Sequence, residues 1–315
     1  MVTREQTLLT WAYEAGFDLA GLAALGPALH GEAFRSWLGR GDHAGMTYLE
    51  RSVEDRCDPT RLLPGARSAL VVGWRYAPLV GEAEPSGDLW PGVARYARGA
   101  DYHETLKARL RQLAERIATH YPGTATRIGV DTSAILERDL AAAAGIGWIG
   151  KNTMLIHPQQ GSWFLLGEIL LTLELVPDEA MADRCGSCTR CLEACPTDAL
   201  AEPYRLDANR CISYWTIEHR GEFPEAIGPL LGDWVFGCDA CQEACPWNRK
   251  PEAVEEPEFA LPSARGELDL AGLLALSRED YVERFRGSPM KRAKLEGLKR
   301  NAVAVRANRV AAGRA

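Results

Sequence analysis

The stretch CGSCTRCLEACP, residues 185–196, places cysteines at 185, 188, 191 and 195 and a proline directly after the last one. A second, incomplete copy, CDACQEACP, spans residues 238–246, and Cys211 stands between the two copies. In the spacing C-x2-C-x2-C-x3-C-P, three thiolates converge on one iron–sulfur cube and the fourth points toward a second cube. The spacing therefore predicts two [4Fe–4S] clusters in a domain of the bacterial ferredoxin type.

This crossed ligation divides eight cysteines into two groups. The first cysteine group is Cys185, Cys188, Cys191 and Cys245, and the second cysteine group is Cys195, Cys211, Cys238 and Cys241. Zinc or disulfides are the alternatives, because paired C-x2-C motifs also build zinc ribbons and oxidised cysteines staple secreted domains. A zinc ribbon has no use for the third closely spaced cysteine or for the proline. The ninth cysteine, Cys57, is interpreted as an incidental free thiol.

Composition predicts a protein of about two domains with a substantial core, since the 315 residues are 46% hydrophobic and 25% charged. The first residues contain no apolar run of the signal-peptide type, and no stretch approaches the roughly twenty apolar residues that span a bilayer. We therefore expect a cytoplasmic protein without a membrane partner, in a compartment where thiolates are free to bind clusters.

Charge is segregated along the chain although the formal net charge is −7. Residues 251–285 carry nine acidic residues against three basic ones, whereas residues 286–315 carry nine Lys or Arg against Glu296 alone. A basic arm on an acidic body suggests a partner that bears phosphates, and a solvated basic tail is the alternative.

Helix and strand patterns alternate before residue 180. Apolar residues recur at helical spacing over 104–120, SALVVGW (68–74) is typical of a strand buried on both faces, and GSWFLLGEILLTLEL (161–175) predicts a central strand. TRIGVD (126–131) predicts a strand that ends at Asp131, and TSAILERDLAAAAG predicts a helix that begins directly after it. In open α/β sheets ligands collect at that end of the strands, which makes Asp131 a candidate site residue.

These patterns predict three parts. An α/β domain spans 1–180, the cluster domain spans 181–250, and an acidic linker with a basic helical segment spans 251–315. The run GIGWIG (145–150) is not interpreted as a dinucleotide site, because it follows a helix where such a loop must follow a strand.

The chain resembles the epoxyqueuosine reductase family over nearly its whole length. The matching stretches are LLPGARSALVV (62–72), ARYARGADYHETLKARL (94–110), VDTSAILERDLAAAAGIGWIGKNTMLI (130–156), GSWFLLGEILL (161–171), RCISYWTIEHRG (210–221), FGCDACQEACPWN (236–248) and the cysteine motifs. Family members commonly continue into a longer helical-repeat region, whereas this chain stops just after a segment like the first helix of that region. We expect any tRNA contact that those repeats supply to be absent here or replaced by the basic arm.

The resemblance implies an α/β (α+β) cobalamin-binding domain like the cores of reductive dehalogenases, joined to the two-cluster domain and a short C-terminal helical segment. It implies reduction of an epoxide on the wobble base of tRNA, with electrons passing through two [4Fe–4S] clusters to cobalamin. Asp131 is the implied proton donor, although a position at a helix start would favour its carboxylate and only burial would oppose that. The candidate cobalamin contacts are Arg56, Arg95, Tyr96, Asp131, Lys151, Asn152, Ser213, Tyr214 and Trp215.

We expect as partners the anticodon stem-loop of tRNA and an external low-potential electron donor, and we expect the protein to be a monomer. His157, before Pro158, is interpreted as a turn residue rather than a cobalt ligand. Two other classes share some of these features. A dehalogenase-like corrinoid reductase acting on a small molecule has no need of the basic arm, and a ferredoxin-type electron carrier has no need of some 180 residues before its clusters.

Overall fold

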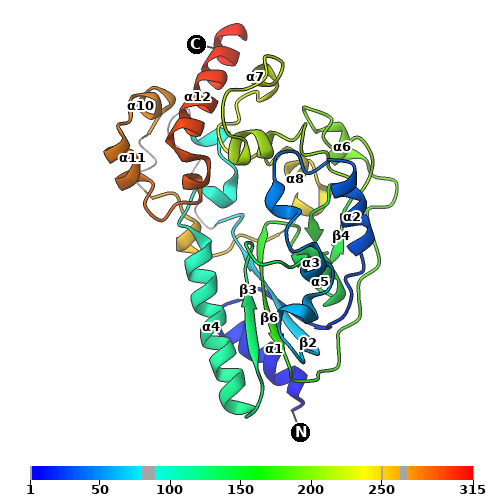
Figure 1. Ribbon diagram of the computed structural model, residues 1–315. Coiled ribbons are helices and arrows are strands. Elements are labelled where there is room, and N and C mark those ends of the chain that lie inside the picture. Colours follow the sequence, from blue (N-terminus) through cyan, green and yellow to red (C-terminus); the bar gives the residue numbers. More distant parts are fainter. Residues whose placement is uncertain (1, 80–88, 250, 263–267, 315) are drawn as a thin grey trace.

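A four-stranded antiparallel sheet forms the centre of the N-terminal half of the computed structural model, which describes residues 2–79, 89–249, 251–262 and 268–314 (Figure 1). Its strands lie in the order β1 (Leu19–Ala24), β2 (Ser68–Arg75), β6 (Phe164–Leu171) and β3 (Thr126–Gly129). The predicted strands at 68–74 and 126–131 are confirmed, and so is the central position of the strand within 161–175. Most of the predicted loop at 78–92, residues 80–88, lies outside the described residues.

Every pair of neighbouring strands in this sheet is antiparallel. The rule that ligands collect at the carboxyl ends of strands belongs to parallel open sheets, so it does not apply to Asp131. The sheet is nevertheless buried on both faces, because helices cover both sides. Strand β2 is accordingly buried along its whole length.

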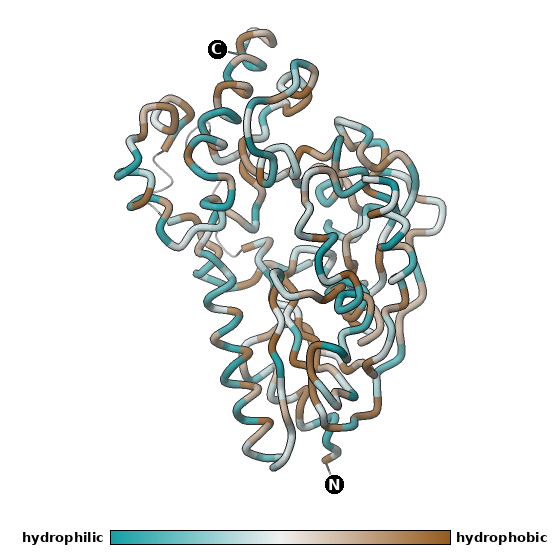
Figure 2. The backbone as a smooth tube through the Cα atoms, in the orientation of Figure 1, coloured by the Kyte–Doolittle hydropathy of each residue, from teal (hydrophilic) through white to brown (hydrophobic). Residues whose placement is uncertain are grey.

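Two apolar cores lie on the two faces of the sheet. On one face α1 (Arg4–Glu14) and α4 (Tyr102–His120) pack against Leu70, Val72 and Trp74 of β2. On the other face α5 (Glu137–Ala143) packs against Ala69 and Val71. Successive residues of a strand point to opposite faces, so β2 contributes side chains to both cores. Figure 2 shows the apolar strands enclosed by the more polar helices.

Local signals explain where α4 and α5 lie. Helix α4 buries Leu106, Leu110, Leu113 and Ile117 on one stripe, and Asp101 caps its start by accepting a hydrogen bond from the backbone N–H of His103. The predicted helix over 104–120 is thus confirmed. The prediction that α5 begins directly after Asp131 is wrong, because residues 132–136 form bends and the helix begins at Glu137 without a side-chain cap.

Beyond the sheet most elements are short, and the long helix α12 (Lys294–Ala311) is the exception. Strands β4 (Trp148–Ile149) and β5 (Leu155–Ile156) form a hairpin. The other helices are α2 (Gly31–Gly39), α3 (Val53–Cys57), α6 (Arg190–Glu193), α7 (Ile227–Leu230), α8 (Ala240–Glu243), α10 (Leu270–Ala275) and α11 (Arg278–Arg284). The 3-10 turns are η1 (Thr47–Leu49), η2 (Pro59–Leu62), η3 (Trp90–Gly92), η4 (Arg95–Ala97), η6 (Pro246–Arg249), η7 (Pro257–Phe259) and η8 (Pro289–Ala293), and η5 (Tyr214–Glu218) is a π-helical turn. The helical predictions for 268–276 and for the segment after Ser288 are confirmed.

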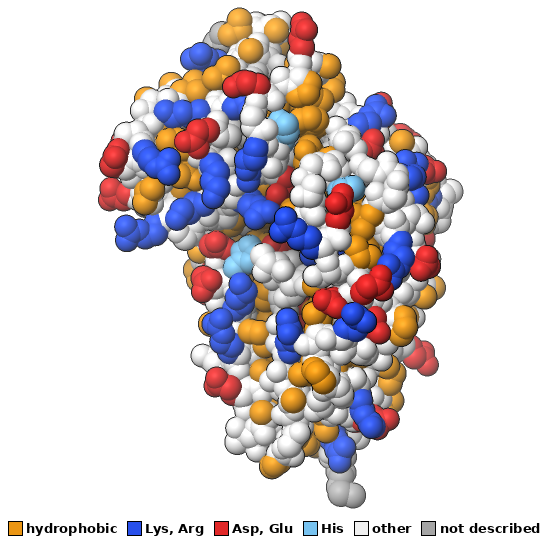
Figure 3. Space-filling view, in the orientation of Figure 1, with side chains coloured by type: hydrophobic (Ala, Val, Ile, Leu, Met, Phe, Trp, Pro, Cys, Tyr) orange, Lys and Arg blue, Asp and Glu red, His pale blue; other side chains and the backbone are white. Residues whose placement is uncertain are grey.

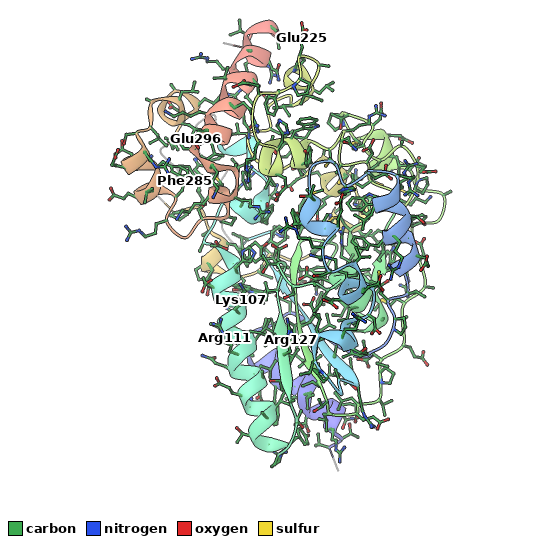
Figure 4. All side chains as sticks on the ribbon, viewed as in Figure 1. Lys107, Arg111, Arg127, Glu225, Phe285 and Glu296 are labelled. Atoms are coloured by element: carbon green, nitrogen blue, oxygen red, sulfur yellow. The ribbon has the colours of Figure 1, made fainter. Side chains whose placement is uncertain are left out.

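A third core, here called the C-terminal core, joins distant parts of the chain. It combines residues from 89–97, Val235 and Phe236 with α10, α11 and α12, and it includes Phe285, which is fully buried (Figure 4). The basic segment is therefore an ordered, packed element rather than a solvated tail. Because this core crosses the predicted limits at 180 and 250, the three-part division of the chain stays a prediction. No helix within the described residues is long and apolar enough to cross a bilayer.

Candidate functional site

The four thiols of the first cysteine group line one small cavity of about 60 Å³. The other lining residues are Lys151, Asn152, Ile156, Arg184, Pro246 and Trp247. The thiols also affect one another, since Cys185 and Cys188 help raise the pKa of Cys245 after the larger effect of burial. Burial and the neighbouring thiols raise the pKa of Cys191 to about 11.

The second cysteine group is also gathered in one place. Burial, followed by the neighbouring thiols of Cys211 and Cys195, raises the pKa of Cys238 to about 12. Burial also contributes most to the raised pKa of Cys241, to which the thiols of Cys238, Cys211 and Cys195 add. The structure thus brings the thiols of each group together, and their assignment as ligands of two clusters stays a prediction.

The donor set of each group fits an iron–sulfur cluster better than a single ion. Within the part of the chain that the structure describes, no three His, Cys, Asp or Glu side chains converge closely enough to hold one metal ion. A zinc ion would draw its thiolates to within about 4 Å of one another, given Zn–S bonds of about 2.3 Å. A cube of four irons holds its cysteine sulfurs farther apart, and its positive irons stabilise thiolates that the bare protein keeps protonated.

Lys151 and Asn152, two of the expected cobalamin contacts, touch the cluster loops. The Lys151 ammonium donates hydrogen bonds to the carbonyls of Gly186, at 2.6 Å, and Cys188, at 3.0 Å. The Asn152 amide lies 3.5 Å from the Cys241 carbonyl. These two residues therefore join the α/β part to both cysteine groups.

Asp131 lies in the loop between β3 and α5, in a left-handed backbone conformation with φ of 47°. Its side chain is 53% exposed, and its carboxylate lies 3.0 Å from Nε2 of His103. The other ring nitrogen of His103 lies 2.7 Å from the Asp101 carboxylate. Burial alone would lower the pKa of His103, but the hydrogen bonds to Asp101 and Asp131 outweigh it and raise that pKa to about 9. At neutral pH the imidazolium therefore holds a proton directly beside the Asp131 carboxylate.

Two further carboxyl groups lie behind the Asp131 loop. Glu137 accepts a hydrogen bond from the backbone N–H of Asp131, and burial followed by the charge of Asp131 raises the pKa of Glu137 to about 8. Glu168 of β6 is fully buried, and neither of its carboxyl oxygens has a hydrogen-bond partner among the described residues. Burial, followed by the charges of Glu137 and Asp131, raises the pKa of Glu168 well above its usual range.

Glycine at position 129 is required by Glu168. Gly129 is paired with Glu168 across β3 and β6, and a Cβ there would lie 2.8 Å from a carboxyl oxygen of Glu168 and 2.9 Å from Ile135. The carboxyl group of Glu168 therefore lies against the backbone of Gly129, two residues before Asp131.

Two other expected contacts, Arg56 and Tyr96, lie near the Asp131 loop, and a third, Arg95, lies against Trp163. Arg56 donates to the carbonyl of Ser133 at 3.3 Å. The ring of Tyr96 meets that of Tyr102 edge to face, and the charge of Asp131 adds to the effect of burial in raising the pKa of Tyr96. The guanidinium of Arg95 lies 5.7 Å from the centre of the Trp163 ring.

The expected contacts at 213–215 lie where η5 begins, beside the second cysteine group. Ser213 lies within hydrogen-bonding reach of Cys211, whose pKa it helps to lower against the larger effect of burial. The Tyr214 hydroxyl accepts from the backbone N–H of Gly45 at 3.1 Å, and the Trp215 indole donates to the carbonyl of Asn209 at 2.8 Å. Single π-helical turns are frequent at functional sites.

His157 accepts hydrogen bonds from the backbone N–H groups of Gln159 and Gln160 through Nδ1, as expected of a turn residue. The sequence reasoning did not single out His103, Glu137, Glu168 or Trp148. A signal for one of them was available, since Glu168 is the single charged residue of the apolar stretch 161–173.

Two family models match the chain. The model of the 4Fe–4S double cluster binding domain covers residues 184–248, and the model described as epoxyqueuosine reductase QueG covers residues 56–132. The epoxyqueuosine reductase of Xanthomonas campestris is 42% identical over 299 residues, which span 93% of this chain and 83% of that protein. The Escherichia coli epoxyqueuosine reductase is 38% identical over 304 residues, spanning 95% and 80% of the two chains.

Solved structures give the same result. A crystal structure of epoxyqueuosine reductase with an epoxyqueuosine-modified stem loop of tRNA-Tyr aligns with a TM-score of 0.89 and 30% identity, covering 98% of this chain and 82% of that one. The Bacillus subtilis epoxyqueuosine reductase, described with its catalytic aspartate loop swung out of the active site, aligns with a TM-score of 0.88 and 29% identity over 96% and 81% of the two chains. The expected fold, an α/β part joined to a double-cluster part, is confirmed.

Proposed function

Because the chain belongs to the epoxyqueuosine reductase family, we propose that it is an oxidoreductase that reduces the epoxide of epoxyqueuosine to the alkene of queuosine in tRNA. The reaction breaks both C–O bonds of the epoxide and consumes two electrons and two protons, so that the oxygen leaves as water. The observation that carries the proposal is the presence, in one chain, of two four-cysteine groups and a half-exposed Asp131–His103 pair that holds a proton.

The protein binds two [4Fe–4S] clusters through its double-cluster domain. We propose the first and second cysteine groups as their ligands. Each cluster transfers one electron at a time, so two clusters match the two electrons of the reaction. An external low-potential donor must supply these electrons.

The second cofactor in this proposal is cobalamin. It is a ligand with a broad ring, amide arms and a phosphate, and the surroundings of Asp131 offer matching partners: cations at Arg56 and Arg95, a tyrosine at Tyr96, and the Ser213–Trp215 turn. When bound, cobalamin supplies a low-potential cobalt centre capable of cleaving a C–O bond. The residues of this chain orient the base, exclude water and deliver protons.

Proton delivery is proposed for Asp131 together with His103. The Asp131 carboxyl group lies 3.0 Å from Nε2 of His103, whose raised pKa of about 9 keeps a proton on the imidazole in the resting protein. The proton sits on His103 and passes to Asp131 as the epoxide oxygen acquires charge. Asp131 is then the group that contacts the substrate, and His103 supplies Asp131 with the proton.

The proposed substrate contact is the anticodon loop, whose wobble base is already single-stranded and can be splayed into a pocket without breaking a base pair. We propose a cytoplasmic location, which a tRNA substrate and thiolate ligands support, and a monomeric protein. A dehalogenase-like reductase or a plain electron carrier is disfavoured by membership of this family.

The experiment uses anaerobically reconstituted protein, tRNA that carries epoxyqueuosine, and a low-potential chemical reductant. We expect queuosine, recognised by mass as the nucleoside lacking one oxygen, and we expect its formation to require both iron and cobalamin. Metal analysis with about eight irons but conversion that is indifferent to cobalamin would refute the cofactor assignment. Absence of conversion by protein loaded with both cofactors would refute the substrate.

A further inference from the structure

Trp148 lies in β4 and packs against the first cysteine group. Its side chain is 2% exposed and forms an apolar cluster with Ile156 and Cys245, with Cys185 and Trp247 packed against it. The rings of Trp148 and Trp247 meet edge to face, with centroids 5.1 Å apart and an interplanar angle of 78°. The Trp148 ring is thus packed against Trp247 beside the first cysteine group.

The indole N–H of Trp148 is buried, and it has no hydrogen-bond partner among the described residues. Leaving a buried N–H without an acceptor costs about 1–3 kcal/mol, and native proteins keep few such groups. A phenylalanine would fill much of the same space without this cost. The retained N–H therefore indicates an acceptor that the bare chain does not provide.

The cysteine sulfurs of the first group are the acceptors that the surroundings offer. Cys245 belongs to the same buried cluster as Trp148, and Cys185 packs against that cluster. A cysteine sulfur gains negative charge, and so becomes a better acceptor, when it binds iron as a thiolate.

The hairpin that carries Trp148 is held tightly against its own second strand. Trp148 is paired with Ile156, and a Cβ at Gly147 would lie 2.2 Å from the Ile156 carbonyl oxygen. Just after β4, Lys151 holds the cluster loop through the carbonyls of Gly186 and Cys188. The indole is thus placed by backbone pairing on one side and by the cluster loop on the other.

We propose that the indole N–H of Trp148 donates a hydrogen bond to a cysteine sulfur, Cys185 or Cys245, of the bound [4Fe–4S] cluster and so raises the reduction potential of that cluster. A reduced cluster carries one more negative charge than an oxidised one, so a donor directed at its sulfur favours the reduced state. The inference rests on the cysteine ligands assigned above and is independent of the epoxide, the tRNA and Asp131.

The test compares the two cluster potentials of reconstituted wild-type and Trp148→Phe protein by redox titration monitored with EPR. We expect one potential to shift to a lower value and the other to stay unchanged, with the iron content preserved. The matched control is Trp11→Phe, which removes an indole of α1 in the core that contains no cysteine of either group, and it should leave both potentials in place. Unchanged potentials in Trp148→Phe, or an equal shift in both variants, would show that no such hydrogen bond acts.

A second measurement remains informative even if Trp148→Phe fails to hold clusters. Trp247→Phe protein is labelled with 15N in its indole groups, and the reduced clusters are examined by pulsed EPR for magnetic coupling to 15N. A coupling to indole nitrogen supports the bond, because Trp148 is the tryptophan packed on the first cysteine group in that variant. The absence of any coupling overturns the proposal.

Discussion

Asp131 and His103 together decide the proton chemistry at the scale of single residues. The substitution Asp131→Asn keeps the size of the side chain and its ability to form hydrogen bonds, but the amide cannot take a proton from His103 and pass it on. We predict that this variant retains clusters and tRNA binding and loses turnover by about 10²–10⁴-fold, the usual range for general acid assistance. Single-turnover conversion of modified tRNA measures this. Turnover at the parent rate would show that another group or water is the donor.

The His103 proton predicts a pH dependence. The pKa of His103 is raised to about 9, so the imidazolium persists through neutral pH and is lost as the pH rises through about 9. We predict that single-turnover rates fall above that pH in the wild type. In His103→Gln, the rate should already be low at neutral pH and should lack that alkaline decline. A wild-type profile that stays flat to pH 10 would exclude His103 as the source of the proton.

Glu168 predicts a pH dependence of stability. Its folded pKa lies well above the usual value, so the folded protein binds a proton that the unfolded chain releases above about pH 4.5. Glu168 therefore lowers the free energy of unfolding least at low pH. It lowers that free energy more as the pH rises toward the pKa of Glu168 in the folded protein. Glu168→Gln removes this ionisation while keeping the shape.

We predict that the stability advantage of Glu168→Gln over the wild type grows between about pH 5 and pH 8, with a limiting slope of about 1.4 kcal/mol per pH unit for one proton. Chemical denaturation of reconstituted protein at a series of pH values measures it. The control is Glu174→Gln, an exposed carboxylate outside the strand. An advantage that does not change with pH would show that Glu168 is ionised in the folded protein.

At the scale of residues, the sequence predicts sites that depend on spacings within a short motif, but not contacts between residues far apart in the chain. The cysteine groups follow from spacings within two short motifs. The contact between His103 and Asp131 joins a helix start to a loop 28 positions later, and only the packing of α4 beside β3 creates it. The expected position of Asp131 at a helix start is wrong because residues 132–136 bend before α5 begins.

At the scale of elements, α12 shows why phosphate binding by the basic arm, residues 286–315, cannot be tested by deleting the arm. The helix buries Leu295, Leu298 and Val305 in the C-terminal core, and Asn301 donates to the carbonyls of Thr216 and Val235. Several of its cations are also engaged, since Arg300 donates to the carbonyls at 215, 219 and 221. Deletion of residues 288–315 would therefore unfold this core rather than remove charge alone.

Substitution of exposed cations is the suitable test of phosphate binding. Figure 3 shows Lys and Arg side chains gathered over the C-terminal helices and across the middle of this face. Lys291 and Lys294 are exposed near the start of α12. We predict that Lys291→Glu with Lys294→Glu weakens tRNA binding. The salt dependence of the binding constant should also become shallower, because fewer tRNA phosphates are neutralised by the protein.

Arg4→Glu, at the opposite end of the molecule near the N-terminus, is the control for a change of charge (Figure 1). Filter binding of modified tRNA at several salt concentrations distinguishes the variants. If the double variant and Arg4→Glu behave alike, the start of α12 makes no phosphate contact.

Element types were largely predictable from periodicity, whereas their arrangement was not. The apolar run of β2 gives the same pattern in a parallel or an antiparallel sheet, because helices cover both faces in either case. Strand order depends on contacts between residues far apart, such as Ser68 with Leu171, which no local pattern records.

At the scale of the whole molecule, the crossed division assigns cysteines from two separate motifs to each cluster. Cys245→Ala should remove the first cluster and Cys211→Ala the second, each leaving about four irons and one EPR signal. Cys57→Ala is the control, since Cys57 lies apart from both groups beside Gly31. Loss of the same signal in both variants would overturn the division into two groups.

The C-terminal core has a consequence for synthesis on the ribosome. Tyr96, a wall of the Asp131 site, packs against both the α1–α4 core and the C-terminal core, and the latter is completed by Val305. Domains generally fold in order as the chain emerges. Here the segment around Tyr96 leaves the exit tunnel about two hundred residues before its partners in α12 do. The reaction site is therefore assembled only after α12 has emerged, and nascent chains carry an unfinished site until then.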